Sequence, residues 1–268
     1  MSGRFYPGAK AELAAAVATL LADAESPGIA PCRAVVVPHA GYVYSGPTAA
    51  AVFARVALPA LVVIVAPNHT GVCRAPGGAS LWEDGAFRTP LGDVPVDATC
   101  AAALRAVSPL VGVDHDAHRA EHAIEVVLPF LQVLRPDVRI VPLVLAWDVW
   151  EPGGAHELGE ALARVVREAQ EPILLVASSD LNHYEPAATG EKKDARALEA
   201  VTALDGAELL ARCRRERITM CGRGPAATVL AAARSLGATR ADVVDYRHSG
   251  WVSGDNSQVV GYGGVVIP

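Results

Sequence analysis

Long hydrophobic runs are missing from this sequence of 268 residues, although 51% of the residues are hydrophobic. No apolar stretch approaches the roughly 20 residues that a membrane-spanning helix needs. The first ten residues, MSGRFYPGAK, lack the apolar core of a signal peptide. Much of the apolar content is alanine and valine, which suits a large buried core. We therefore expect a cytoplasmic protein that does not enter a membrane.

A concentration of positive charge is missing too. The net charge is −6, and acidic and basic residues are mixed along the chain. The most basic run, Arg212 to Arg217, falls in a helix-like stretch and is typical of a solvated helix face. Because no basic stripe with interleaved aromatic residues occurs, we do not expect nucleic-acid binding.

Cysteine is scarce and scattered. The cysteines are odd in number, widely spaced and never form C-x-x-C; they are Cys32, Cys73, Cys100, Cys213 and Cys221. This usage argues against a disulfide framework or a zinc ribbon and fits a reducing compartment. The P-loop, G-x-G-x-x-G and G-x-S-x-G motifs are also missing, so nucleotide binding and serine-hydrolase chemistry have no support.

Strand-like and helix-like stretches alternate over most of the length. Short apolar runs predict strands at 33–37, 61–66, 138–145, 173–177, 241–247 and 257–267. Helical patterns occur at 9–24, 46–57, 98–107, 154–169, 191–204, 206–214 and 225–236, and a β-hairpin is expected within 79–97. The alternation predicts an α/β fold, a three-layer α/β/α sandwich with a central mixed, largely parallel sheet. Because no linker or repeat interrupts it, residues 1–268 are expected to form one domain.

One segment, DHDAHRAEHAIE, is dense in titratable groups and is expected to open a helix that continues to Leu134. On such a helix His118 and His122 would share one face, as would Glu121 and Glu125. Two histidines four residues apart resemble half of a zinc-helix motif, but the H-E-x-x-H order is absent. We expect a polar helix face with one or two members directed at a site.

Three of the predicted strands end in a loop that carries a histidine. Residues 33–37 lead to His39, residues 61–66 lead to His69, and the run ILLVA leads to SSDLNHY with Asp180 and His183. The carboxyl ends of parallel strands meet at one edge of a sheet, where open α/β folds bind ligands. If these strands are neighbours, their imidazoles should lie on one rim.

His39, His69 and Cys221 are the candidate metal ligands, because two imidazoles and a thiolate suit zinc, iron or copper. Taken singly, each histidine also fits a hydrogen-bonded loop residue, and Cys221 fits a small buried residue. Asp180 and His183 are the candidate catalytic pair: a carboxylate can orient an imidazole, which then acts as a ligand or as a general acid/base. The alternative is that Asp180 caps its loop and His183 packs.

Motifs spread along the chain resemble those of the Memo family. In order they are GRFYPG, PHAGYVYSG (38–46), PNHTG (67–71), EHAIEVVLPFLQ (121–132), SSDLNHY (178–184), MCGRGP (220–225) and SGDNSQVVGYG (253–263). They cover nearly the whole chain in the family's order, so the resemblance is specific. In bacteria and archaea this family often accompanies a radical-SAM protein and a third small protein, in the AmmeMemoRadiSam system. The resemblance therefore implies such partners.

The resemblance also implies a fold similar to that of class III extradiol ring-cleaving dioxygenases. Those enzymes hold non-haem iron by two histidines and a glutamate. Position by position, the two histidines fall on His39 and His69, and the third ligand falls on Cys221. Asp180 and His183 match the family's site pair, with His183 resembling the acid/base histidine of the dioxygenases. Fe(II) is the metal implied first, with copper or zinc as alternatives.

One departure leaves the reaction open. A thiolate stands in place of the glutamate, and Fe(II) prefers the harder oxygen donor more than copper or zinc does. Ring cleavage therefore does not follow from the fold. Three functions stay open: a metal-dependent redox enzyme that uses oxygen on a small-molecule substrate, an enzyme with Cys221 as nucleophile and His183 and Asp180 as base and orienter, and a binding or adaptor protein.

Overall fold

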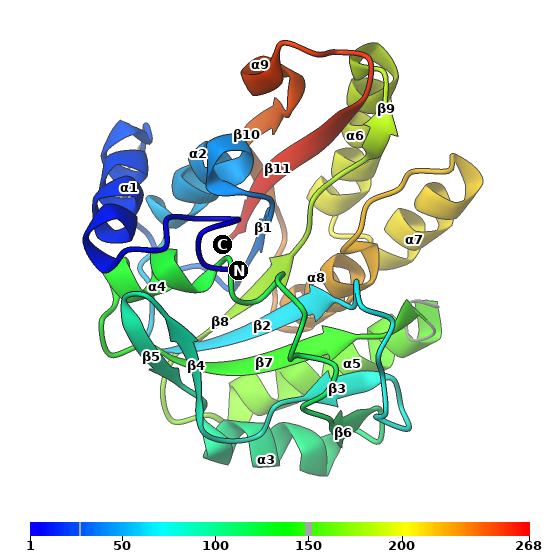
Figure 1. The fold of residues 1–268 in the computed structure, drawn as a ribbon. Coiled ribbons are helices and arrows are strands. Elements are labelled where there is room, and N and C mark those ends of the chain that lie inside the picture. The colour runs from blue at the N-terminus through cyan, green and yellow to red at the C-terminus, as the bar shows by residue number, and fades with distance from the viewer. Residues whose placement is uncertain (27, 148–151) are drawn as a thin grey trace.

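A mixed β-sheet runs through the middle of the molecule (Figure 1). The computed structural model describes residues 1–26, 28–147 and 152–268. Within these residues the sheet has nine strands. In spatial order they are β10 (Asp242–His248), β11 (Val259–Ile267), β1 (Ala34–Val37), β8 (Ile173–Ser178), β2 (Leu61–Pro67), β7 (Arg139–Leu145), β3 (Ala79–Leu81) and β6 (Val111–Val113), with β9 (His183–Glu185) pairing to β11.

The four central strands β1, β8, β2 and β7 are adjacent and parallel. Strand β11 is antiparallel to β1, and β3 is antiparallel to β7, so the sheet is mixed. The register pairs Val37 with Ser178 and Val65 with Ala177. The loops that follow β1, β8 and β2 therefore leave the sheet side by side. This confirms the predicted α/β fold with a mixed, largely parallel sheet.

The central strands bury side chains on both faces of the sheet. Along β2, Val63 and Val65 belong to one hydrophobic cluster, whereas Val62 and Ile64 belong to another. Side chains of an extended strand alternate between the two faces. Burial on both faces is typical of parallel strands covered by helices, which explains the uninterrupted apolar runs in the sequence.

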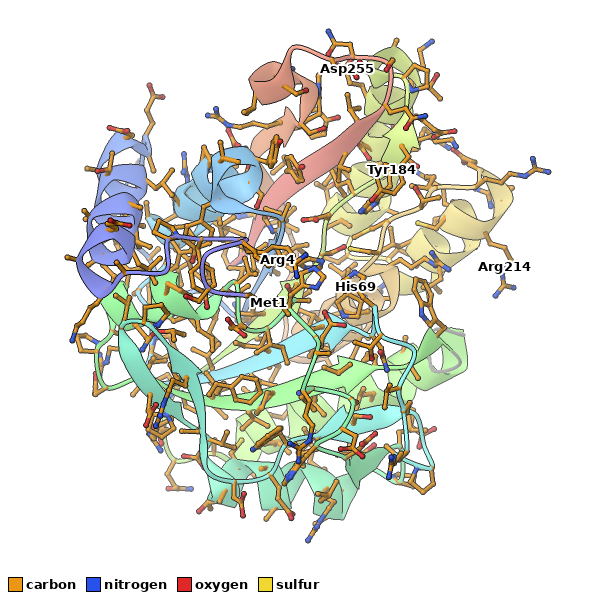
Figure 2. All side chains as sticks on the ribbon, viewed as in Figure 1. Met1, Arg4, His69, Tyr184, Arg214 and Asp255 are labelled. Carbon is orange, nitrogen blue, oxygen red and sulfur yellow. The ribbon has the colours of Figure 1, made fainter. Side chains whose placement is uncertain are left out.

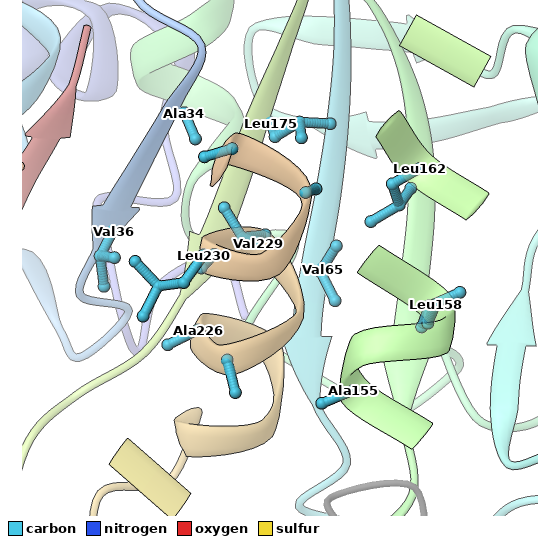
Figure 3. Packing of buried hydrophobic residues seen from close by; sticks show 14 of the residues in the cluster. Ala34, Val36, Val65, Ala155, Leu158, Leu162, Leu175, Ala226, Val229 and Leu230 are labelled. Atoms are coloured by element: carbon cyan, nitrogen blue, oxygen red, sulfur yellow. The ribbon is translucent and has the colours of Figure 1, made fainter. Parts of the chain in front are cut away.

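Helices cover both faces and complete the three predicted layers. The first cluster includes residues of α3 (Ala98–Val107), α5 (Pro152–Glu168), α6 (Ala187–Thr202), α7 (Gly206–Arg215) and α8 (Arg223–Ser235). The second includes residues of α1 (Lys10–Asp23), α2 (Tyr42–Phe53) and α4 (Leu128–Leu134). Figure 3 shows α8 and α5 packed over the central strands, with Leu230 and Leu158 turned toward the sheet. None of the described helices has both the length and the apolar character needed to cross a bilayer.

Most predicted elements are present, with shifted ends in several cases. Helix α2 begins at Tyr42 rather than at residue 46, so Pro47 lies inside it. The predicted hairpin is formed by β4 (Ala86–Thr89) and β5 (Gly92–Pro95). The preceding residues form β3, which joins the main sheet and was not predicted. A short helix, α9 (Gly250–Ser253), follows β10.

The long helix predicted to run from the acidic segment to Leu134 is wrong. Residues 114–127 form turns, and only α4, Leu128–Leu134, is helical. Acidic side chains compete for the backbone N–H groups: Glu121 accepts from the N–H groups of His122 and Ala123, and Asp114 accepts from that of Ala117. Such local bonds favour turns over a helical ladder. The residues of this segment therefore do not share helix faces.

Phe130 connects α4 to the core, and its truncation tests this packing. The ring is buried and lies near the rings of Phe53 and Tyr42, with centroids 5.8 and 5.0 Å away. We expect Phe130→Ala to lower the free energy of unfolding by about 3–5 kcal/mol. Leu134 on the same helix is 37% exposed, so Leu134→Ala should cost less than about 1 kcal/mol. Urea denaturation would measure both; equal losses would contradict this packing.

Candidate metal centre

His39 is a buried imidazole whose protonation pattern follows from its partners. Its Nδ1 lies 2.8 Å from Ser178 Oγ, and Ser178 in turn donates its hydroxyl proton to the Ala123 carbonyl at 2.6 Å. Because that proton is already used, His39 Nδ1 must be the donor to Ser178. The lone pair of the neutral ring is therefore on Nε2, the atom that faces Cys221 Sγ at 3.4 Å. This is the tautomer that a metal ligand needs.

His69 is held in the same tautomer by a buried carboxylate. Glu121 Oε1 accepts from His69 Nδ1 at 2.8 Å, and Oε2 accepts from the His69 backbone N–H at 2.6 Å. These bonds to His69 and to backbone N–H groups outweigh burial and lower the pKa of Glu121 to about 2. An ionised carboxylate that fixes Nδ1–H is the usual support of a metal-binding histidine. The His69 side chain is 29% exposed, so this side of the cluster reaches solvent.

His122 is a third imidazole in the cluster. Its ring stacks on that of His69 with centroids 4.6 Å apart, and its Nδ1 lies 3.3 Å from Glu121 Oε1. On its other side it stacks on Phe5, also at 4.6 Å. Ligand atoms of His39, His69 and His122 lie within 4.8 Å of one another. His122 is therefore a possible ligand as well as a packing partner.

Cys221 lies on the other side of His39, in the turn that precedes α8. Its sulfur accepts from the Asp180 backbone N–H at 3.2 Å. Ligand atoms of His39, Asp180 and Cys221 form a second group within 4.8 Å. The turn is tight: a Cβ on Gly222 would lie 2.4 Å from the Ser178 carbonyl oxygen, so only glycine fits there. Burial, and then the Asp180 carboxylate, raise the pKa of the Cys221 thiol well above its usual range.

Asp180 does not make the contact that its sequence position suggested. Its Oδ1 accepts from the His39 backbone N–H at 2.8 Å, and its Oδ2 lies 4.0 Å from His39 Nε2. His183, three residues later, instead directs Nδ1 to the Thr219 carbonyl at 3.1 Å. Burial raises the pKa of Asp180, and the nearby His183 acts in the opposite direction. The carboxylate thus orients the loop of His39, while a backbone carbonyl orients His183.

Of the five residues singled out from the sequence, His39, His69 and Asp180 lie in loops at the carboxyl edge of β1, β2 and β8. Cys221 lies on the turn before α8, and His183 is the first residue of β9. His39, Asp180 and Cys221 are in direct contact; His69 joins them through His39, at a ring distance of 5.2 Å. His183 affects the pKa values of both His39 and Asp180. It is therefore within electrostatic reach of the cluster, although it belongs to neither group of ligand atoms within 4.8 Å.

Sequence reasoning did not assign Ser178, Glu121 and Thr219 their supporting roles. Glu121 was expected only as part of a polar helix face, yet it binds the His69 loop. Ser178 is the last residue of β8, and the alternation of side chains along the strand determines the face of the sheet on which its hydroxyl meets His39. Glu121 lies in a segment rich in titratable residues, and this was the sequence feature that could have indicated a functional role. The sequence does not indicate which distant loop Glu121 contacts.

The amino-terminal residues pack against this site. The Phe5 carbonyl accepts from the Tyr42 backbone N–H at 2.8 Å, next to the loop of His39. The Tyr6 hydroxyl donates to Glu125, and the terminal ammonium lies 3.1 Å from the same carboxylate. Figure 2 shows Met1 and Arg4, from the same segment, in the same part of the molecule as His69. They complete one wall of the cluster through the Phe5–His122 stack.

Comparison with known proteins gives matches over the full length. A family model described as "Memo-like protein" matches residues 1–266. A MEMO1 family protein of Methanopyrus kandleri is 40% identical, covering 100% of this chain and 97% of the relative. MEMO1 family proteins of Aquifex aeolicus and Thermotoga petrophila are each 39% identical, over 100% and 98% of this chain and 97% and 96% of their own lengths.

The buried histidines make stability depend on pH. Burial lowers the pKa of His39 to about 3 and those of His118 and His122 to about 4. The folded metal-free protein keeps these rings neutral, whereas the unfolded chain binds protons below about pH 6.5. Stability should therefore be fully present above about pH 6.5 and fall by up to about 2 kcal/mol per histidine on going to about pH 5. Asp194, with its pKa raised to about 6 by burial, offsets part of this loss.

Urea denaturation of metal-free protein between neutral pH and about pH 5 would measure this loss. His118 is separate from the two ligand groups, so His118→Leu should remove one contribution and give a shallower pH dependence. A free energy of unfolding that stays constant over this range would contradict the assignment of neutral buried rings.

Proposed function

Because this chain belongs to the Memo family, and because His39 shares one group of ligand atoms with His69 and a second with Cys221, we propose that it binds one metal ion on His39, His69 and Cys221 and uses it to oxidise a small organic molecule. The observation that supports this most is the anchoring of both imidazoles. Ser178 holds Nδ1–H of His39 and Glu121 holds Nδ1–H of His69. Both Nε2 lone pairs are thereby available without prior loss of a proton.

The donor set fits a cation for electrostatic reasons as well. Cys221 and Asp180 are buried side by side, and neither pKa favours the charged form. A bound cation would stabilise the Cys221 thiolate, which is the form that binds metals. His39 belongs to both groups of ligand atoms, whereas His69 and Cys221 belong to different ones, so binding by all three requires these two side chains to come closer together.

Iron is the first candidate metal, and copper and zinc are alternatives. Imidazole suits all three, and the thiolate shifts preference toward the softer ions. Bound iron or copper would supply electron transfer and an open position for oxygen, whereas zinc would supply Lewis acidity alone. His122 is placed to be an additional donor beside His39 and His69.

The chain's own residues have separable roles in such a reaction. His183 is the proposed proton carrier: the Thr219 carbonyl accepts a hydrogen bond from its Nδ1–H, which leaves Nε2 as the basic atom. Asp180 keeps the His39 loop in place and would contribute negative charge once a cation is bound. The partly exposed face of His69 is where a small-molecule substrate would approach.

The cysteine-nucleophile alternative has less support. Burial and the Asp180 carboxylate both disfavour a Cys221 thiolate. A nucleophilic cysteine needs the opposite, a pKa lowered by cationic neighbours. A purely binding function would retain the cluster without turnover, and oxygen-consumption assays on catechols and other small phenols separate it from the redox proposal.

Metal content of protein purified without oxygen tests the proposal. We expect about one redox-active ion per chain, lost in His39→Ala and in Cys221→Ser. His156→Ala is the matched control, because His156 lies on α5 beside a different cavity, against α7 and α8, and this variant should keep its metal. Wild-type protein that holds no metal and takes up none of Fe(II), Cu(I) or Zn(II) would overturn the proposal.

Glu121 gives a second, graded test. Glu121→Gln keeps the shape of the side chain but replaces one acceptor with a donor, so the bonds to His69 cannot all form. Loss of such a support typically lowers metal affinity about 10–100-fold. Glu168→Gln, at an exposed carboxylate on α5, should leave affinity unchanged. Competition with a chromogenic chelator would measure both; equal affinities would remove Glu121 from the supporting role.

A further inference from the structure

His183 is fixed by one residue, Thr219, at two points. Its Nδ1 lies 3.1 Å from the Thr219 carbonyl oxygen, and its backbone N–H donates to Thr219 Oγ1 at 2.8 Å. A carbonyl oxygen can only accept, so Nδ1 must carry the proton. The conformation of the Thr219 backbone therefore decides which nitrogen of His183 is basic.

Thr219 is fixed in turn by the buried side chain of Asn182. Asn182 Oδ1 accepts from the Thr219 backbone N–H at 3.0 Å and lies 3.1 Å from Thr219 Oγ1. Its Nδ2 donates to Glu185 Oε2 at 2.6 Å. A backbone donor on one side and a carboxylate on the other allow only this orientation of the amide. Asn182 therefore holds both the backbone and the hydroxyl of Thr219.

Asn182 is itself held on both sides of its backbone. Its N–H donates to the buried Asp194 carboxylate at 2.7 Å, and its carbonyl accepts from the Gly261 N–H of β11 at 3.0 Å. The side chain is buried, with 1% of the residue exposed. This position is anchored to α6 and to the sheet, so it provides a rigid support for the two loops that carry His183 and Cys221.

We infer that Asn182 and Thr219 are positioning residues that hold His183 as the Nδ1–H tautomer and so leave Nε2 as its basic atom. A catalytic role for this tautomer rests on the proposed function, in which His183 moves protons. The tautomer itself is independent of that function, because it is a property of the metal-free chain. Asp180, the partner suggested by sequence proximity, is not needed to orient the ring.

Nitrogen-15 NMR of histidine-labelled, metal-free protein tests the inference, because the shifts of Nδ1 and Nε2 distinguish the tautomers of a neutral ring. His183→Gln identifies the signals. The variants are Asn182→Ala, Thr219→Val, which removes the hydroxyl and keeps the branched shape, and Thr219→Ser, which restores the hydroxyl. Thr228→Val is the matched control, since the buried Thr228 hydroxyl has no hydrogen-bond partner among the described residues.

We expect wild type, Thr219→Ser and Thr228→Val to show the Nδ1–H form of His183. In Thr219→Val and Asn182→Ala the ratio of Nδ1–H to Nε2–H should fall about fivefold or more, as loss of one ordinary hydrogen bond produces. An Nε2–H ring in wild type would overturn the inference, as would an unchanged ratio in folded Thr219→Val. Because no metal is present, failure of the metal-site proposal would leave this result unaffected and is detected separately by metal content.

Discussion

The arrangement of the centre depends on one buried carboxylate. Glu121 accepts hydrogen bonds from both the ring and the backbone of His69 and from the backbone of His122 and Ala123. These bonds join the loop after β2 to a distant segment of the chain. They keep Glu121 ionised and His69 in the ligand tautomer. Asn68 fixes the same loop through bonds within it, whereas Glu121 is the residue that links the loop to the segment of His122.

The neutrality of the histidines follows from burial and from their closeness to one another. His39 and His122 are desolvated, and a charge on His39 would further disfavour protonation of His122. The rings therefore remain Lewis bases near neutral pH, while Cys221 and Asp180 supply anionic character only when a cation balances it. Ser178, Glu121 and Thr219 give three of the imidazoles a defined direction, so the cluster is organised before any ligand enters.

The sequence was sufficient for the elements whose environment is uniform. Strands such as β2 and β8 are buried on both faces and appear as unbroken apolar runs. Because β1, β8 and β2 are neighbours, the loops with His39, Asp180 and His69 leave one edge of the sheet, whereas His183, which was expected on the same rim, begins β9. Prediction from the sequence failed where side-chain hydrogen bonds replace the regular backbone bonds of a helix. Residues 114–127 fold as turns because Glu121 and Asp114 accept hydrogen bonds from backbone N–H groups, and the hydrophobic periodicity of the sequence does not reveal such bonds. Asp180 was paired with His183 by proximity, yet its partner, His39, is 141 residues earlier.

The position of β11 has a consequence for how the protein forms. This last strand lies between β10 and β1 and also pairs with β9, so it supports the strand before His39 and the strand that contains His183. Contacts between residues 34–37 and 259–267 close a loop spanning most of the chain, which makes folding slow. During synthesis the segments that precede β11 leave the ribosome with the edge of β1 unpaired. The strands that lead to His39 and contain His183 therefore gain β11 as their partner only after every segment of the centre has been made.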